Sequence, residues 1–434
     1  MKEKLAFALL AASMAFFFAC GRNAEEPWTK PTVNLNKTLT NELSDTSSLK
    51  HLDRDINIFM RKWGLRGVSL SVMRNDSLLF SKGYGWADEE AGEAMTPGHI
   101  MRVASVSKLL TATGIMVLCE QGKLKLKDQV FGADGILNDI DYINAINDKR
   151  YYKITVENLL RHEAGFTSRF GDPMFSTRVV MMQNHLTEAP DHNTLVKCML
   201  KKRLRYMPGT SQEYSNFGYL LLSMIIEKVT GESYEKWMQD NVLDKAGCVD
   251  MHIGGTYFAD RRAGEAKYYP PDNEPEVEEY NNSGRMVQRC YGGSDLHGLS
   301  GAGAWTASSA ELALFVASID GRDEIPDIIS KESVLEMTRY YDDGTFSLGW
   351  NDTKPQNGWT RTGTLSGTSA LIKYFPDGWC WVMITNTSTW KGPRLARYHI
   401  KALFNNCKAK YGDRFPAKNL FYDQNCNNPA GFNF

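Results

Sequence analysis

The chain has 434 residues, which is enough for one large domain or for two to three smaller ones. Hydrophobic residues make up 42% of the chain and charged residues 23%, a composition typical of globular proteins rather than of disordered or fibrous ones. Fifty Lys and Arg residues balance 51 Asp and Glu residues, giving a formal net charge of -1. Without a basic excess the chain lacks the electrostatic footprint of a nucleic-acid binder, so we expect no nucleic-acid partner.

The first twenty residues are typical of an export signal. A short charged segment at residues 1–4 precedes an apolar run at Leu5–Ala19, which is too short to span a bilayer comfortably. The run ends at Cys20, and the pattern resembles a bacterial lipoprotein signal in which this cysteine becomes the lipidated first residue. An ordinary secretory signal or an uncleaved anchor remains the alternative. We expect an exported protein on the periplasmic or cell-surface side of a bacterial membrane, lipid-anchored through Cys20.

Composition divides the chain into four segments. We expect a signal peptide at residues 1–19, a polar tether at 20–47, one folded domain at 48–405 and a C-terminal tail at 406–434. The tether is rich in Ser, Thr and Asn, whereas apolar periodicity begins at about residue 50.

The cysteines and histidines give no sign of a metal centre. Seven cysteines follow Cys20, and their irregular spacing is not that of a disulfide framework. Cys407 and Cys426 lie close together in the sequence and are candidates for a pair, whereas we expect the others to be small buried hydrophobic residues. No CxxC or HExxH motif occurs and the eight histidines are scattered, so we expect neither a metal nor a cofactor.

Strand-like segments occur at both ends of the folded part, and helix-like segments lie between them. In chain order, we expect strands at 67–73 and 78–84 around an Asn75-Asp76 turn, helices at 109–122 and 217–229, strands at 369–375 and 379–385, and a helix at 393–405. Strands at the two ends with helices between them predict an α/β fold. Its antiparallel sheet is built from both chain ends and flanked by helices, with an inserted, mainly helical subdomain.

The first candidate for chemistry is Ser105-Val106-Ser107-Lys108, immediately before a helical pattern. On a helix, Ser105 and Lys108 are one turn apart on the same face. A serine hydroxyl needs a neighbouring base, and an amine becomes one when burial or positive neighbours lower its pKa. Alone, the motif is weak, because helices often begin with a capping serine and a solvated lysine.

A second candidate is Tyr214-Ser215-Asn216, immediately before the apolar segment Phe217–Val229. In an extended backbone the phenol and the amide point to the same side, so both can enter one cleft. A tyrosine whose phenolate is stabilised by cations can relay a proton. Taken by itself, the motif is better explained structurally: the tyrosine then lies at a boundary between subdomains, and the asparagine caps the helix.

The third candidate is Arg361-Thr362-Gly363-Thr364, ahead of the C-terminal hairpin. Gly363 lets the backbone approach a ligand closely, and the Thr364 N–H at a sheet edge can complete an oxyanion hole. Arg361 offers a two-pronged cation for a carboxylate. By itself, a surface turn explains the run equally well.

Together, the SxxK motif, the YxN motif and the basic-Thr-Gly run are far more specific than any one of them. In this order they resemble the serine β-lactamase and penicillin-binding-protein superfamily, and in particular its class C branch, which includes D-alanyl-D-alanine carboxypeptidases, D-aminopeptidases and esterases. Surrounding segments such as KGYGWAD, ITVENLLRHEAG and YFPDGWCWVMITN extend the resemblance over residues 50 to 405.

The resemblance implies a role for each matching residue. Ser105 is then the nucleophile, Lys108 its partner base, and Tyr214 the group that shuttles protons to the leaving group and from the deacylating water. Asn216 binds the acyl side chain of the substrate and orients Lys108. The main-chain N–H groups of Ser105 and Thr364 form the oxyanion hole. Thr362 and Gly363 belong to the substrate-binding strand.

Arg361 departs from the family pattern, which usually has Lys or His at this position. Arginine keeps its charge permanently and cannot carry a proton. It can still bind a substrate carboxylate and lower the pKa of Tyr214. The substitution therefore argues against β-lactam turnover more than against acyl-enzyme chemistry.

Four further residues have a plain structural interpretation. We expect His162 and Ser107 to be structural. Gly298–Ala302 invites comparison with a nucleophile elbow but lacks the GxSxG pattern and its strand-to-helix context, so Ser300 is expected in a tight loop. Trp359 is a candidate wall of the substrate site, with core packing at least as plausible.

These features predict an exported serine hydrolase that cleaves an ester or an amide of a small molecule or peptide through a Ser105 acyl-enzyme. Within that class we rank an esterase or a D-amino-acid peptide hydrolase above an efficient β-lactamase. The alternative is a non-catalytic, or acylation-only, lipoprotein that binds penicillin or cell-wall peptides on the same scaffold. The oligomeric state and the physiological substrate stay open.

Overall fold

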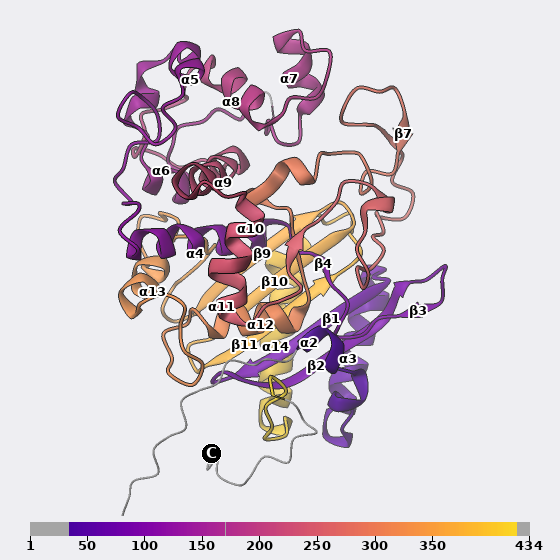
Figure 1. Ribbon diagram of the computed structural model, residues 1–434. Coiled ribbons are helices and arrows are strands. Elements are labelled where there is room, and N and C mark those ends of the chain that lie inside the picture. The colour runs from indigo at the N-terminus through magenta and orange to yellow at the C-terminus, as the bar shows by residue number, and fades with distance from the viewer. Residues whose placement is uncertain (1–33, 170, 423–434) are drawn as a thin grey trace, which may run out of the picture. The chain divides into compact units, whose positions relative to one another are not determined.

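A computed structural model describes residues 34–169 and 171–422 (Figure 1). Its central element is a six-stranded antiparallel sheet with the order β3-β2-β1-β11-β10-β9. The strands are β1 (Gly67–Arg74), β2 (Ser77–Asp88), β3 (Glu93–Ala94), β9 (Trp359–Leu365), β10 (Thr368–Tyr374) and β11 (Trp379–Thr385). Because β1 pairs with β11, the sheet joins the two ends of the chain, which confirms the sequence prediction.

Two tight turns fix the ends of the central hairpins. Asn75 and Asp76 have φ values of 46° and 58°, which short polar side chains tolerate better than most residues. In the other hairpin Gly378 supplies the positive φ, at 80°. The two turns meet at one end of the sheet, where the Asn75 N–H donates to the Gly378 carbonyl at 2.9 Å. This contact fixes the Val68↔Thr385 to Arg74↔Trp379 register between the hairpins.

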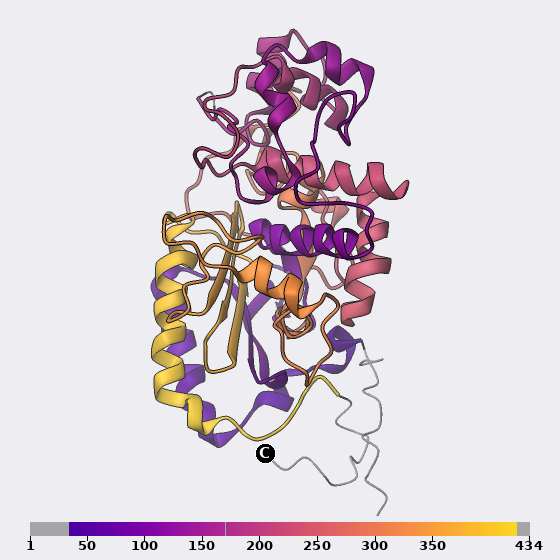
Figure 2. The same ribbon diagram turned by 90° about the vertical axis from the view of Figure 1, so that its left-hand side faces the viewer.

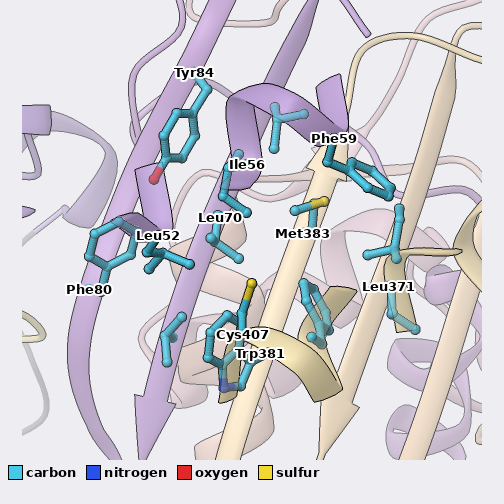
Figure 3. Close-up of a cluster of buried hydrophobic side chains, with 14 of the residues drawn as sticks. Leu52, Ile56, Phe59, Leu70, Phe80, Tyr84, Leu371, Trp381, Met383 and Cys407 are labelled. Atoms are coloured by element: carbon cyan, nitrogen blue, oxygen red, sulfur yellow. The ribbon is translucent and has the colours of Figure 1, made fainter. Parts of the chain in front are cut away.

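One face of the sheet is covered by α3 (Lys50–Trp63) and α14 (Lys401–Tyr411), both of which lie on the same side in Figure 2. Figure 3 shows the side chains between them: Leu52 and Ile56 of α3 and Cys407 of α14 point toward Leu70 and Trp381 of the sheet. All five are at most 1% exposed. Removing such apolar surface from water is the main force that holds the helices to the strands.

The opposite face is covered by α12 (Ser309–Ala317), which packs on β1 and β11. The contact includes a buried hydroxyl group, because the Ser309 Oγ lies 2.7 Å from Ser69 Oγ and 2.8 Å from Ser71 Oγ. With both faces covered, β1 is buried at every residue except Arg74.

Further helices lie in the segment between the two hairpins. They are α4 (Ser107–Glu120), α5 (Ile140–Ala145), α6 (Val156–Leu160), α7 (Thr177–Asn184), α8 (His192–Leu200), α9 (Asn216–Thr230), α10 (Tyr234–Met238), α11 (Asp244–Ala246) and α13 (Lys331–Thr338). Figure 1 shows α9, with α6 beside it, between α4 and the outer group α5, α7 and α8. The α9 helix ends at Gly231, whose φ of 76° makes it a left-handed cap.

The short strands of this segment form two further small sheets. A three-stranded sheet has the order β4 (Met101–Arg102), β8 (Trp305–Ala307), β5 (His252–Ile253), and a two-stranded one joins β6 (Val277–Glu278) to β7 (Met286–Val287). The predicted α/β fold with an inserted, mainly helical region is therefore confirmed.

The folded unit is longer at both ends than the expected domain at 48–405. Residues 34–47 are not all tether: α2 (Leu35–Thr38) and a 3-10 turn (Asn41–Ser44) lie here, and Leu35 and Leu39 are buried. The Ser44 Oγ donates to the Ser81 carbonyl at 2.8 Å. Composition misled the prediction, because a few apolar residues within a polar stretch are enough to hold it against the body.

The expected tail at 406–434 is also partly folded. The helix predicted to end at 405 runs to Tyr411, and Leu420 and Phe421 are buried. The Leu420 N–H donates to the Leu78 carbonyl, which ties this segment to the edge of β2.

Several sequence predictions lie outside the described residues. These are the signal peptide, Cys20 and Cys426; Cys407 itself is a free, buried thiol. Within residues 34–169 and 171–422, no helix is both long and apolar enough to span a membrane, and no cluster of three or more His, Cys, Asp or Glu residues is arranged to hold a metal.

Candidate active site

Ser105 lies in a 3-10 turn, η3 (Ala104–Val106), that leads directly into α4. The preceding Ala104 has a φ of 50°, an uncommon conformation for alanine that lifts the chain from β4 into the turn. Such strain is found mostly where a tightly constrained geometry is needed. Lys108 is the second residue of α4, so its side chain projects from the first helical turn beside Ser105.

Lys108 is completely buried, and its amine has three neighbours. The Nζ donates to Asn216 Oδ1 at 2.6 Å, to the Ala302 carbonyl at 2.6 Å and to Ser105 Oγ at 3.4 Å. Burial lowers the pKa of the Lys108 amine, and the Arg361 cation lowers it further, whereas the Tyr214 phenolate opposes this effect. A lowered pKa makes it easier for this amine to lose a proton and then to act as a base.

Tyr214 stands opposite the lysine, one residue before the Ser215 cap of α9. Its hydroxyl donates to Ser105 Oγ at 2.9 Å. Partial burial raises the pKa of Tyr214, but the Lys108 and Arg361 cations outweigh burial and lower it to about 8. A tyrosine with this pKa is partly ionised near neutral pH and can act as an acid or as a base.

Asn216 is the first residue of α9, and Ser215 rather than Asn216 caps the helix, because the Ser215 side chain accepts from the Gly218 N–H. This leaves the Asn216 amide free to turn toward the site. Its Oδ1 accepts from Lys108, and its Nδ2 donates to Asp172 Oδ2 at 2.7 Å. The amide therefore connects the lysine to a carboxylate that the sequence analysis did not single out.

Arg361 is buried, and its guanidinium group makes contacts other than the expected ones. Its Nε donates to the Ser105 carbonyl at 2.7 Å, and its Nη2 donates to the same oxygen and lies 3.4 Å from the Tyr214 hydroxyl. The Arg361 guanidinium, which we expected to bind a substrate carboxylate, thus binds the main-chain carbonyl of Ser105 instead. Its expected effect on the pKa of Tyr214, by contrast, is present.

The β9 edge strand passes very close to Ser105. A Cβ atom on Gly363 would lie 2.1 Å from the Val103 carbonyl oxygen and 3.1 Å from the Ser105 nitrogen, so only glycine fits here. The Thr362 N–H leaves the sheet toward Asn351 Oδ1, at 2.7 Å. In a strand, alternate N–H groups point the same way, so the Thr364 N–H also leaves the free edge of the sheet, beside Ser105.

His162 supports Tyr214 from behind. It is buried, its ring packs against the Tyr214 ring at a centroid distance of 4.4 Å and a tilt of 35°, and its Nδ1 accepts from the Ser215 N–H at 3.1 Å. Burial, followed by the charges of Lys108 and Arg361, holds its pKa well below the usual range. His162 is therefore neutral and structural, in agreement with the sequence interpretation.

The other candidates are structural. Ser107 Oγ accepts from the Trp305 N–H at 3.1 Å, and Ser300 Oγ donates to Ser223 Oγ at 3.1 Å. Ser300 is buried at a strained φ of 41°, in the loop whose Ala302 carbonyl holds Lys108. Trp359 is no wall of this site, because its ring stacks on Tyr374 within the sheet at 4.6 Å.

The structure thus brings Ser105, Lys108, Tyr214 and Asn216 together, with Gly363 beside them. Sequence reasoning missed Asp172 and the Ala302 carbonyl. No sequence signal marks either contact, because both residues are far from Ser105 along the chain and because a backbone carbonyl carries no side-chain signature.

Comparison with known proteins agrees with this geometry. The Beta-lactamase family model matches residues 52–405. A putative penicillin-binding protein, PbpX, of Bacillus subtilis (strain 168) is 25% identical over 87% of this chain and 88% of its own length. Protein flp of Staphylococcus aureus (strain N315) is 26% identical, but the match covers only 49% of this chain and 38% of the relative.

Among solved structures, a D-amino acid amidase from Ochrobactrum anthropi SV3, complexed with L-phenylalanine amide, has the same fold. Its TM-score is 0.65 at 19% identity, covering 84% of this chain and 99% of the amidase. The fold and the site define a β-lactamase-like serine hydrolase scaffold. Because the family model spans most of the chain, the chain belongs to the Beta-lactamase family.

Proposed function

We propose that this protein hydrolyses an ester or an amide through an acyl-enzyme formed on Ser105. One observation carries the proposal: Ser105 Oγ lies within 2.9 Å of the Tyr214 hydroxyl and 3.4 Å of the Lys108 amine. A serine hydroxyl becomes a nucleophile when a base within hydrogen-bond reach removes its proton. Here two groups with lowered pKa values are in that position.

In the acylation step, the Ser105 Oγ attacks the carbonyl carbon while its proton passes to the Lys108–Tyr214 pair. The carbonyl π electrons move onto oxygen, and the N–H groups of Ser105 and Thr364 stabilise the oxyanion. When the tetrahedral intermediate collapses, the bond to the leaving group breaks. Tyr214, at the solvent side of the site with 38% of its surface exposed, gives the proton to the departing amine or alcohol.

Deacylation reverses these roles with water as the nucleophile. Tyr214 removes a proton from the water, the carbonyl carbon is attacked again, and the proton returns to Ser105 Oγ as the acid leaves. His162 does not take part, because it is buried behind Tyr214 and has no contact with Ser105 in the hydrogen-bond network.

The substrate class proposed is an ester or a D-amino-acid amide rather than a β-lactam. The similarity to a D-amino acid amidase supports this proposal, as does the use of Arg361 inside the site. A cation that is bound to a backbone carbonyl is not free to hold the carboxylate of a β-lactam or a carboxypeptidase substrate.

We further propose that the protein is exported and anchored by a lipid on Cys20. The apolar run that ends at Ala19-Cys20 supports this proposal. Metabolic labelling with a fatty acid is expected to mark the wild type and to spare Cys20→Ala. Equal labelling of the two proteins would contradict it.

The decisive experiment is activity-based labelling of Ser105. A fluorophosphonate or penicillin probe is expected to add its mass to the wild-type peptide that contains Ser105 and to leave Ser105→Ala unmodified. Turnover of nitrocefin, short-chain p-nitrophenyl esters and D-Ala-D-Ala peptides is then compared between the two proteins. Failure of folded wild-type protein to react with either probe contradicts the proposal. Binding of a cell-wall peptide without turnover, unchanged in Ser105→Ala, would instead favour the binding lipoprotein.

A further inference from the structure

Asp172 lies at the end of the hydrogen-bonded chain that begins at Ser105. Its Oδ2 accepts from Asn216 Nδ2 at 2.7 Å, and Asn216 in turn accepts from Lys108. Its Oδ1 accepts from the Met174 N–H at 2.9 Å, a local turn that fixes the carboxylate. Two side chains, Lys108 and Asn216, therefore separate Asp172 from the nucleophile.

The carboxylate of Asp172 lines a pocket beside Tyr214 that contains a second acid, Glu213. The charge of Glu213 is balanced by an ion pair, in which its Oε2 accepts from the Arg205 guanidinium at 2.6 Å. Asp172 differs: among the described residues, no Lys, Arg or His forms an ion pair with it. None of the residues that line this pocket in the structure is basic.

The nearest cations do not compensate this charge directly. Lys108 lies on the far side of Asn216, and its amine is hydrogen-bonded to that amide, to the Ala302 carbonyl and to Ser105 rather than to Asp172. Arg361 is bound to the Ser105 carbonyl. A half-buried carboxylate without a counter-ion has an unmet preference for a positive partner, and a substrate can provide it.

We propose that Asp172 selects substrates whose acyl part carries an ammonium group. This inference rests on the proposed function, since it concerns the acyl side of the same site. In the complex the ammonium donates to the Asp172 carboxylate while Asn216 keeps its orientation toward Lys108. Asp172 is thus a specificity-determining residue and, through Asn216, a positioning residue.

The test compares two boronic acids that form a reversible Ser105 Oγ–boron bond and so slow fluorophosphonate labelling of Ser105. One is 1-aminoethylboronic acid, which carries an ammonium, and the other is its N-acetyl derivative. The wild type is expected to bind the ammonium compound more tightly. In Asp172→Asn, which keeps the size of the side chain, this preference is expected to fall about 10- to 100-fold, the range for a hydrogen bond to a charged group. A third compound, the N-acetylated boronic analogue of lysine, tells whether the ammonium must lie on the α-carbon or can lie at the end of the side chain.

The ratio between the compounds separates selection from a merely structural role. If Asn216 positioning were the whole function of Asp172, the variant would lose affinity for all compounds equally and the ratio would not change; that result overturns the inference. Equal affinities in the wild type would also overturn it. The surface variant Asp323→Asn, which removes a charge that is 85% exposed, is the matched control and is expected to keep the wild-type ratio. Absence of Ser105 labelling without any inhibitor is a failure of the proposed function itself, and is recognised as such before the ratio is measured.

Discussion

Two buried polar clusters at opposite ends of the central sheet show how neighbours decide the sign of a pKa shift. The candidate active site lies where Thr364 pairs with Ser369, and the second cluster lies at the Asn75-Asp76 turn, at the other end of the strands. In the first cluster, two basic side chains surround a phenol. In the second, carboxyl groups surround one another.

In the second cluster, Asp76 is 1% exposed and Asp320 is 7% exposed. Asp76 accepts from the Ile325 N–H at 3.3 Å, and Asp320 accepts from the Arg322 N–H at 2.9 Å. Apart from the facing carboxyl group and the Tyr374 hydroxyl beside Asp320, no described donor reaches Asp76 Oδ1 or Asp320 Oδ2. Burial, and then the charge of Asp320, raise the pKa of Asp76 to about 9.

The comparison shows that burial opposes charge in both clusters, but that neighbouring charges decide the outcome. Near Ser105, cations overcome the burial of Tyr214 and favour the phenolate. Near Asp76, a second acid adds to the burial and favours the protonated form. The first arrangement makes a reactive group near neutral pH, and the second keeps a proton inside the protein. Three substitutions can break or sharpen this contrast.

The largest expected effect is that of Lys108→Met, which keeps the apolar stem and removes the base. We expect the rate of Ser105 acylation to fall by about a thousandfold or more, because general-base catalysis of this kind contributes ~10²–10⁴. The thermal midpoint is expected to change little, since burying an amine is itself costly. Stopped-flow or timed labelling with a fluorophosphonate measures the rate. Lys236→Met, at a lysine that is 62% exposed, is the control, and a wild-type rate in Lys108→Met would remove the lysine from the mechanism.

The next effect is that of Arg361→Met, which removes one of the two cations beside Tyr214. The pKa of Tyr214 then rises from about 8 toward its ordinary value of about 10. Less phenolate is present at pH 7, so we expect kcat/KM to fall roughly 10- to 100-fold and its ascending pH limb to move to higher pH. Arg361→Lys keeps a charge and is expected to move the limb less. A limb that stays in place in Arg361→Met would show that Tyr214 does not respond to this cation.

The smallest effect is on stability. Asp76 has a folded pKa above its unfolded value of about 3.9, so the folded protein keeps a proton that the unfolded chain releases. Its contribution to stability is full below about pH 4 and is lost as pH rises toward 9. Asp76→Asn removes this loss, and asparagine suits the positive φ of the turn.

We therefore expect Asp76→Asn to raise the free energy of unfolding by on the order of 2 kcal/mol at pH 8 and by much less at pH 4. Urea unfolding at the two pH values measures it. A gain of the same size at both pH values would mean that the proton is not the cause. Catalysis is expected to stay unchanged, because the turn lies at the far end of the sheet.

Much of the fold was predictable because its signals are local. The strand patterns of β1 and β11 and the Asn75-Asp76 turn each depend on residues within a few positions. The ends of the folded unit were not predictable, because the burial of Leu35 and Phe421 depends on surfaces distant in the sequence.

The sequence by itself determined which residue types are available for chemistry, and their order: a serine one helical turn from a lysine, then a tyrosine two residues before an asparagine. Only the tertiary structure decided their partners. It bound Arg361 to the Ser105 carbonyl, turned Asn216 between Lys108 and Asp172, and stacked Trp359 inside the sheet. The physical reason is that motif spacing is set by local backbone geometry, whereas hydrogen-bond partners and burial arise between segments that meet only when the chain folds.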